Sequence, residues 1–148
     1  MSKRFDNKVI MVTGTTSGLG KHAAIAFAAA GASVVASGRR EAEGAQTIAA
    51  IEAVGGTGVF VPADVSHSDD VARIVATARD RFGGLDYAYN VAGIPGDAFA
   101  KAAEYGEDEF DETITTNLKG VFLCMKHAIP AMLERGGGAI VNMSSISG

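Results

Sequence analysis

The sequence is poor in several residue types that mark particular classes of protein. Of its 148 residues, one is cysteine, three are proline and none is tryptophan. A single cysteine, Cys124, excludes a disulfide framework within the chain and favours a reducing, cytoplasmic setting. Apolar residues flank Cys124 on both sides, which predicts a buried small hydrophobic residue rather than a nucleophile.

Positive charge and long apolar runs are also scarce. The 13 lysines and arginines are scattered and outnumbered by 17 acidic residues, so the net charge is -4. Binding to a nucleic-acid backbone needs clustered basic residues, so no nucleic-acid partner is expected. No apolar run approaches the roughly 20 residues that cross a bilayer, and the polar N-terminus carries no apolar signal core. The sequence indicates no metal site.

What the chain has in quantity is apolar residues, at 47%, and 19 glycines. This composition is typical of one soluble globular domain, which we assign to residues 1–148. Apolar runs predict strands near residues 8–13, 33–37, 58–62, 85–90 and 138–143. Helical patterns alternate with them near residues 18–30, 41–54, 67–82 and 107–134. Unbroken apolar strands that alternate with helices predict an α/β fold with a doubly wound parallel sheet, of the Rossmann type.

Two helix boundaries carry specific predictions. Residues 66–69 read Ser-His-Ser-Asp, which fits a capping box at the start of the helix near 67–82. Pro130 is expected to kink the last helix or to end its regular part.

The turn between the first strand and the first helix holds three glycines in the pattern Gly-x-x-x-Gly-x-Gly. Glycines permit a sharp turn and close approach of the backbone to a ligand. The N–H groups that begin the helix favour an anion such as a pyrophosphate. A glycine cluster alone is more often only a turn, but its βαβ setting favours a dinucleotide site. The candidate cofactor-binding residues here are Gly14, Thr16, Ser17, Gly18, Leu19 and Gly20.

The second strand ends at Ser37-Gly38-Arg39-Arg40, without the acid that commonly binds the adenosine ribose in NAD sites. A guanidinium suits a 2′-phosphate because it offers several donors and a permanent charge. Arg39 therefore favours NADP as the cofactor, with NAD as the alternative. It could also be a solvated loop residue, or stack on adenine with no phosphate present.

The third and fourth strands also end in polar or small residues. Asp64 could accept a hydrogen bond from the adenine amino group, or it could cap the following helix. After the fourth strand, small residues leave room for a flat nucleotide, and the amide of Asn90 could join neighbouring strand ends. An ordinary polar turn is the alternative. The candidates at these two strand ends are Asp64, Val65, Asn90, Ala92 and Gly93.

Two further polar sites follow. Asn117 interrupts an apolar helix, and since asparagine is a poor helix former, a buried role is expected. It could hold a water or cap a bend near Gly120. The fifth strand leads into Ser144 and Ser145, whose hydroxyls could bind a substrate carbonyl; a serine-rich turn is the plainer interpretation.

As a set, these motifs resemble the short-chain dehydrogenase/reductase family over essentially the whole chain. The glycine spacing is that family's version of the fingerprint, and the other motifs follow in the family's order. Val91 departs from it, because the family often has a second asparagine there. The resemblance implies hydride transfer between a nicotinamide cofactor and an alcohol or carbonyl substrate. It implies that Ser145 orients the substrate, that Asn117 holds a water in a proton relay, and that a tyrosine and a lysine complete the set.

The family's Tyr-x-x-x-Lys lies on the helix after the serine strand, and this sequence stops at Gly148. Its tyrosines, Tyr87, Tyr89 and Tyr105, are not followed by lysine four residues on. We therefore expect a fragment of a longer enzyme, lacking its C-terminal strands and helices and inactive by itself. The resemblance implies that the full-length protein is a homo-oligomer, a dimer or tetramer paired through the helix that contains Asn117 and the helix after it. The loop 94–99 is expected to border the substrate.

Two other interpretations stay open at this point. One is a catalytically inactive dinucleotide-binding module with a sensing or scaffolding role. The other is a flavodoxin-like or methyltransferase-like domain, against which the glycine spacing, Asn90 and Asn117 argue.

Overall fold

The computed structural model describes residues 3–97 and 99–145. In this part of the chain, five parallel strands form one sheet in the order β3-β2-β1-β4-β5. The register pairs Thr13 with Ser37 and Asn90 with Asn142, so the carboxyl ends of the strands meet at one edge. The strands are β1 (Val9–Thr13), β2 (Ser33–Gly38), β3 (Thr57–Pro62), β4 (Tyr87–Asn90) and β5 (Ala139–Asn142).

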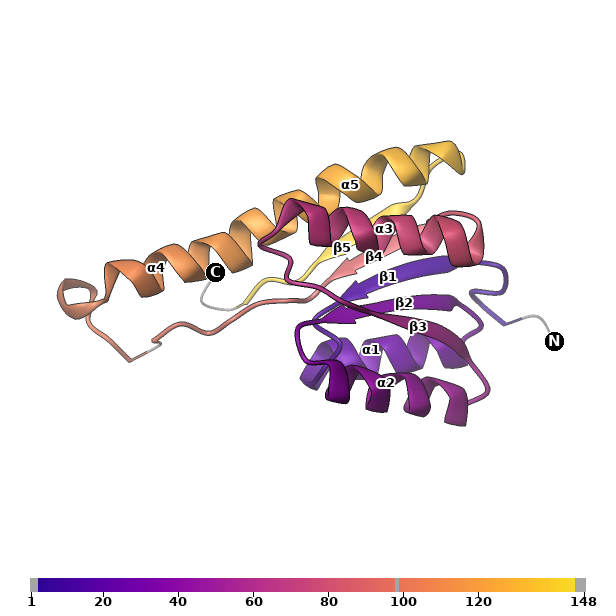
Figure 1. Ribbon diagram of the computed structural model, residues 1–148, viewed down its shortest axis with the longest axis horizontal. Coiled ribbons are helices and arrows are strands. Elements are labelled where there is room, and N and C mark those ends of the chain that lie inside the picture. The colour runs from indigo at the N-terminus through magenta and orange to yellow at the C-terminus, as the bar shows by residue number, and fades with distance from the viewer. Residues whose placement is uncertain (1–2, 98, 146–148) are drawn as a thin grey trace.

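Helices cover both faces of the sheet (Figure 1). α1 (Gly18–Ala29) and α2 (Glu41–Ala53) lie on one face, while α3 (Ser68–Phe82) and α5 (Gly120–Glu134) lie on the other. The strand order reverses direction at β1, next to β4, which is the switch point at which such sheets bind ligands. The doubly wound parallel sheet predicted from the sequence is thereby confirmed.

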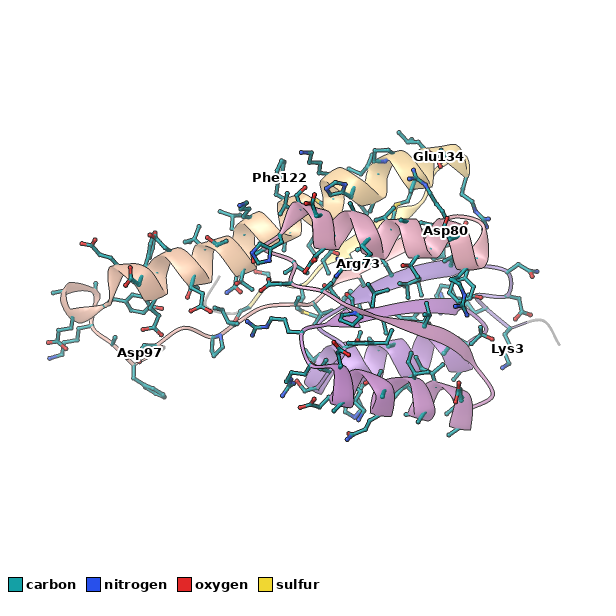
Figure 2. All side chains as sticks on the ribbon, in the orientation of Figure 1. Lys3, Arg73, Asp80, Asp97, Phe122 and Glu134 are labelled. Carbon is teal, nitrogen blue, oxygen red and sulfur yellow. The ribbon has the colours of Figure 1, made fainter. Side chains whose placement is uncertain are left out.

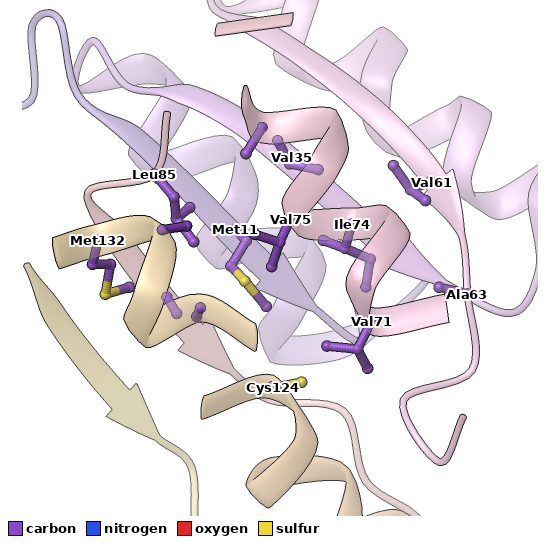
Figure 3. Packing of buried hydrophobic residues seen from close by; sticks show 14 of the residues in the cluster. Met11, Val35, Val61, Ala63, Val71, Ile74, Val75, Leu85, Cys124 and Met132 are labelled. Carbon is purple, nitrogen blue, oxygen red and sulfur yellow. The ribbon is translucent and has the colours of Figure 1, made fainter. Parts of the chain in front are cut away.

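The core has two layers because side chains alternate across the sheet. Ile10 and Val12 point into a cluster beneath α1 and α2, whereas Met11 points into a larger cluster beneath α3 and α5. Figure 3 shows this larger cluster, with Met11 between Val75 of α3 and the residues of α5. Cys124 belongs to it and is 1% exposed. Burial raises the pKa of this thiol to about 12, so its predicted role as a small hydrophobic residue is confirmed.

The helix predicted over residues 107–134 is divided. It consists of α4 (Glu107–Ile114), a π-helical turn η2 (Thr115–Lys119) and α5, after a short 3-10 turn η1 (Ala102–Glu104). α5 continues through Pro130, so the proline does not end the helix. π-helical turns are rare and frequently mark functional sites, and this one contains Asn117. Together α4 and α5 form a long rod that extends beyond the carboxyl edge of the sheet (Figure 1).

The capping box predicted for α3 does not form. The residue before the helix is His67, which makes no side-chain cap hydrogen bond. The Ser66 hydroxyl donates instead to Oδ1 of Asp64, at 2.7 Å. Among the helices of the described residues, none has the length and apolar character to traverse a membrane.

Candidate functional site

A cleft of about 480 Å³ opens at the carboxyl ends of β1 to β4. It is lined by most of the residues that the sequence analysis proposed for cofactor binding: Gly14, Thr16, Ser17, Gly18, Leu19, Gly20, Arg39, Asp64, Val65, Ala92 and Gly93. The remaining lining residues are Ser37, Gly38, Arg40, Ala63, Val91, Ile94 and Thr116. A cleft of this size is in the range of small-molecule and cofactor sites.

The glycine turn packs against the backbone of the neighbouring strand end. Gly14 has a φ of +73°, and a Cβ there would lie 2.8 Å from Cα of Ala92. A Cβ on Gly20 would lie 2.1 Å from the carbonyl oxygen of Gly14. A Cβ on Gly18 would meet nothing within 4 Å. Gly14 and Gly20 thus serve close packing, while Gly18 borders open space at the start of α1.

The N-terminus of α1 is uncapped. Ser17, the residue before the helix, makes no side-chain cap hydrogen bond, and the first turn of α1 contains no acidic residue. The first N–H groups of a helix have no partner within the helix and carry partial positive charge. Because Gly18, Leu19 and Gly20 line the cleft, the start of α1 offers donors for an anion there.

Buried hydroxyl groups, which were not among the candidate site residues, brace the glycine turn. Oγ1 of Thr13 accepts hydrogen bonds from the N–H groups of Val91 and Ala92, both at 3.1 Å. Oγ1 of Thr47, on α2, donates to the carbonyl oxygen of Thr15 at 2.7 Å. Thr13 could have been found as a polar residue that closes an apolar strand. Thr47 lacks such a signal, because its partner lies 32 residues away.

Two arginines lie at the end of β2. The Arg40 guanidinium donates to Oγ1 of Thr16 at 3.0 Å and forms an ion pair with Glu43 at 3.4 Å. These contacts hold Arg40 in the lining of the cleft, beside Thr16 of the glycine turn. Arg39 is exposed and lies close enough to Asp64 to lower the pKa of that carboxyl.

Asp64 follows β3 and is partly buried. Its Oδ1 accepts hydrogen bonds from both the N–H and the hydroxyl of Ser66, at 2.9 and 2.7 Å. Burial raises the pKa of Asp64, but these hydrogen bonds and the charges of His67 and Arg39 outweigh it and leave the pKa below its ordinary value. Asp64 is therefore an ionised acceptor at the wall of the cleft near neutral pH.

Asn90 lies behind the cleft rather than in its wall, and is 2% exposed. Its Nδ2 donates to Oδ1 of Asn142 at 2.8 Å, and its carbonyl oxygen accepts from the N–H of Met143 at 2.9 Å. The amide thus joins the ends of β4 and β5, as predicted for an asparagine at this position.

Asn117 contacts the loop that follows β4. Its Oδ1 accepts from the N–H of Ile94 and its Nδ2 donates to the carbonyl oxygen of Ile94, both at 2.8 Å. Asn117 is exposed, so the expected buried role is wrong. Its neighbour Thr116 and its partner Ile94 both line the cleft.

The serines after β5 lie outside the cleft's lining. Ser144 and Ser145 are exposed in this chain, and β5 is an edge strand of the described sheet, with Val141 and Met143 exposed beside them. Ala98, in the loop expected to border the substrate, and residues 146–148 lie outside the described residues.

Comparison with known proteins agrees with this arrangement. The family model described as short chain dehydrogenase matches residues 8–148. A 3beta-hydroxysteroid dehydrogenase of Mediterraneibacter gnavus is 44% identical over 98% of this chain and 52% of its own length. A cyclohexanol dehydrogenase of an Acinetobacter species is 38% identical over 100% of this chain and 59% of its own length.

Solved structures give the same result. The NAD+-bound xylitol dehydrogenase superposes with a TM-score of 0.94 at 29% identity, over 99% of this chain and 56% of that one. A short-chain dehydrogenase/reductase from Burkholderia xenovorans superposes with a TM-score of 0.92 at 34% identity, over 99% and 57%. The chain spans about half the length of the curated relatives it matches. By its matching family model, its strand order and its glycine turn, the chain belongs to the short-chain dehydrogenase family.

Proposed function

We propose that this chain supplies the cofactor site of an NADP-dependent oxidoreductase that acts on a small alcohol or carbonyl compound. One observation carries the proposal. The uncapped N-terminus of α1 and the open space at Gly18 border a cleft that Arg39 and Asp64 also line. A cleft that offers donors to an anion and an acceptor to a nucleoside suits a dinucleotide.

The residues present fit such a group. A pyrophosphate placed on the helix start would accept hydrogen bonds from the N–H groups that lack a cap. Asp64, kept ionised by Ser66, would accept a hydrogen bond from the adenine amino group. The cofactor, when bound, supplies or accepts the hydride.

NADP is preferred because the end of β2 suits a phosphate better than a ribose hydroxyl. A Cβ on Gly38 would lie 2.6 Å from Cγ2 of Thr16, so an acid at this position requires Thr16 to move. Arg40 is already engaged with Thr16 and Glu43. Arg39 is therefore the guanidinium at this strand end that would bind a 2′-phosphate. The NAD+-bound state of the similar xylitol dehydrogenase makes NAD the competing cofactor.

In the reaction, Ser145 would orient the substrate oxygen, and Asn117 would fix the loop at Ile94 beside the cleft and support the proton relay. Both roles follow from the family. The two hydrogen bonds between Asn117 and the backbone of Ile94 add a structural reason for an asparagine at this position.

The test is a fluorescence titration of the full-length protein with NADPH and with NADH. We expect the native protein to bind NADPH more tightly than NADH. Arg39→Gln should lose affinity for NADPH about tenfold or more, because a charge-assisted contact to phosphate is removed, and should keep its affinity for NADH. Arg39→Lys should retain part of the affinity for NADPH. Arg81→Gln, an exposed arginine in the last turn of α3, is the matched control. Equal or better binding of NADH by the native protein would overturn the preference for NADP.

We further propose that the outer face of the rod pairs with a second copy. Phe110, Ile114, Leu118 and Phe122 are all exposed and recur every four residues. Phe122 points away from the sheet (Figure 2). Contiguous apolar patches on a surface usually mark interfaces. Leu118→Asp should convert a dimer or tetramer to smaller species in sedimentation, and an unchanged mass would contradict this surface.

A further inference from the structure

The loop between β3 and α3 is braced from the first turns of α3 by one ion pair. The side chain of Asp70 accepts a hydrogen bond from the N–H of Asp64 on Oδ2, at 2.8 Å. Its Oδ1 accepts from the Arg73 guanidinium, also at 2.8 Å. Arg73 in turn donates to the carbonyl oxygen of Pro62, the last residue of β3. Figure 2 shows Arg73 on α3 above the strands.

This brace fixes the backbone on both sides of Ala63. The N–H of Ala63 donates to the carbonyl oxygen of Gly38 at 2.9 Å, which ties the same segment to the residue before Arg39. The backbone positions of Pro62, Ala63 and Asp64 are thus set by three contacts from outside the loop.

The side chain of Asp64 is left with one oxygen for a ligand. Both hydrogen bonds from Ser66 end on Oδ1. Among the described residues, no hydrogen bond ends on Oδ2. Because Asp64 lines the cleft, the direction of Oδ2 depends on the backbone that Asp70 and Arg73 hold.

We propose that Asp70 is a positioning residue for the adenosine half of the cofactor, acting through the N–H of Asp64 and with Arg73 as its support. The inference rests on the proposed function, since it concerns the same cleft. Asp70 does not line the cleft and touches no ligand itself. Its role is to hold the acceptor Asp64, and the adjoining end of β2, at fixed distances from one another.

The chain provides a matched control in Asp69. Both carboxylates lie in the first turn of α3, so both interact with the positive end of the helix. Asp69 is exposed, whereas Asp70 bonds the loop. If Asp70→Ala loses more ligand affinity than Asp69→Ala, the difference is due to the contacts of Asp70 with the loop and not to the loss of a negative charge at the helix end.

The experiment measures binding of NADPH, of 2′-phospho-ADP-ribose and of reduced nicotinamide mononucleotide by the full-length protein, using calorimetry. We expect Asp70→Ala to weaken the first two ligands about tenfold, the loss that corresponds to one hydrogen bond to a charged group. Binding of the mononucleotide, which lacks the adenosine half, should be unchanged. In kinetics the effect should lie in the KM for NADPH rather than in kcat. Asp70→Asn keeps an acceptor for Asp64 and should recover part of the affinity.

The outcomes separate this inference from the proposed function. If the native protein does not bind 2′-phospho-ADP-ribose, the proposed function fails. If the native protein binds it and Asp70→Ala binds as tightly as Asp69→Ala, the brace has no role in binding and the inference is overturned. Equal losses for all three ligands would also overturn it, because they would show general destabilisation. Arg73→Met provides a second variant, with a loss in the same two ligands expected.

Discussion

The amide of Asn117 and the backbone of Ile94 form a closed pair, with Oδ1 accepting from the Ile94 N–H and Nδ2 donating to the Ile94 carbonyl, both at 2.8 Å. The loop after β4 has left the sheet at this point, so its backbone groups need other partners. The π-helical turn places the asparagine opposite them. A Cβ on Gly93 would lie 3.2 Å from Oδ1 of Asn117, so a side chain there would crowd the pair.

Replacing Asn117 by Ala should loosen the wall of the cleft. Two hydrogen bonds of about 1 kcal/mol each are lost, and the exposed setting reduces the effect, so we expect a decrease of about 1–2 kcal/mol in the free energy of unfolding. Cofactor affinity should also decrease, because Ile94 lines the cleft. Urea unfolding and NADPH titration measure the two effects. Lys119→Ala, in the same π-helical turn, is the control, and a loss as large in that variant would contradict the role of the pair.

Replacing Gly14 by Ala should lower the free energy of unfolding by more than the strain of its backbone angle alone. Gly14 and Gly83 have similar positive φ values, +73° and +80°, but a Cβ meets Ala92 only at Gly14. The left-handed conformation costs a non-glycine residue about 1–2 kcal/mol, and overpacking adds about 1–3 kcal/mol. Urea unfolding should therefore show a larger loss of stability for Gly14→Ala than for Gly83→Ala. Equal losses would mean that the backbone of Ala92 yields freely.

The order of elements and most of the cleft could be predicted because their signals are local. An apolar run, a glycine turn and a polar strand end are each contained in a few neighbouring residues. The sheet then brings the strand ends together, as the pairing of Asn90 with Asn142 illustrates.

What could not be predicted is which partner each polar group meets in the folded chain. The sequence indicated a capping box at the start of α3, but Asp64 accepts the Ser66 hydroxyl and Asp70 accepts the Asp64 N–H. Which acceptor a hydroxyl or an N–H finds depends on the folded backbone rather than on sequence spacing. Likewise, the residues around Asn117 do not reveal that its amide bonds the backbone of Ile94, 23 residues away, and that Asn117 is therefore held at the surface.

The thiol of Cys124 should be unreactive in the folded protein. Because burial raises its pKa to about 12, the reactive thiolate is nearly absent at pH 8. Ellman's reagent should label the protein only at the rate at which it unfolds, and immediately in denaturant. Rapid labelling of the native protein at pH 8 would show that this part of the core opens readily.

The hydrogen bonds from Ser66 to Asp64 should make stability depend on pH. Burial opposes ionisation of Asp64, but the bonds and nearby positive charges hold its pKa below the ordinary value of 3.8. A lowered pKa stabilises the folded state above the unfolded pKa, and this contribution is lost as the pH falls through the folded pKa. Ser66→Ala removes the hydroxyl bond and keeps the N–H bond, so the stability advantage of the native protein over this variant reports the hydroxyl alone. This advantage should be complete above about pH 5 and should shrink below pH 3.8. An advantage that stays constant to pH 3 would contradict this account.

Asp86 should contribute to stability without affecting the cleft. Its carboxylate, 5% exposed, accepts from the N–H of Val9 at 2.8 Å and from the Arg135 guanidinium at 3.1 Å. Val9 begins β1 and Asp86 precedes β4, so these contacts lie at the edge of the sheet opposite the cleft. Asp86→Ala leaves a buried N–H without its acceptor and should lower the free energy of unfolding by about 1.5–3 kcal/mol. The control Asp80→Ala, an exposed acid on α3 (Figure 2), should change it by less than about 0.5 kcal/mol. Because the amino ends of the strands are remote from the cleft, the folded Asp86→Ala protein should bind NADPH with native affinity. Weaker binding would show that strain at one edge of the sheet reaches the other.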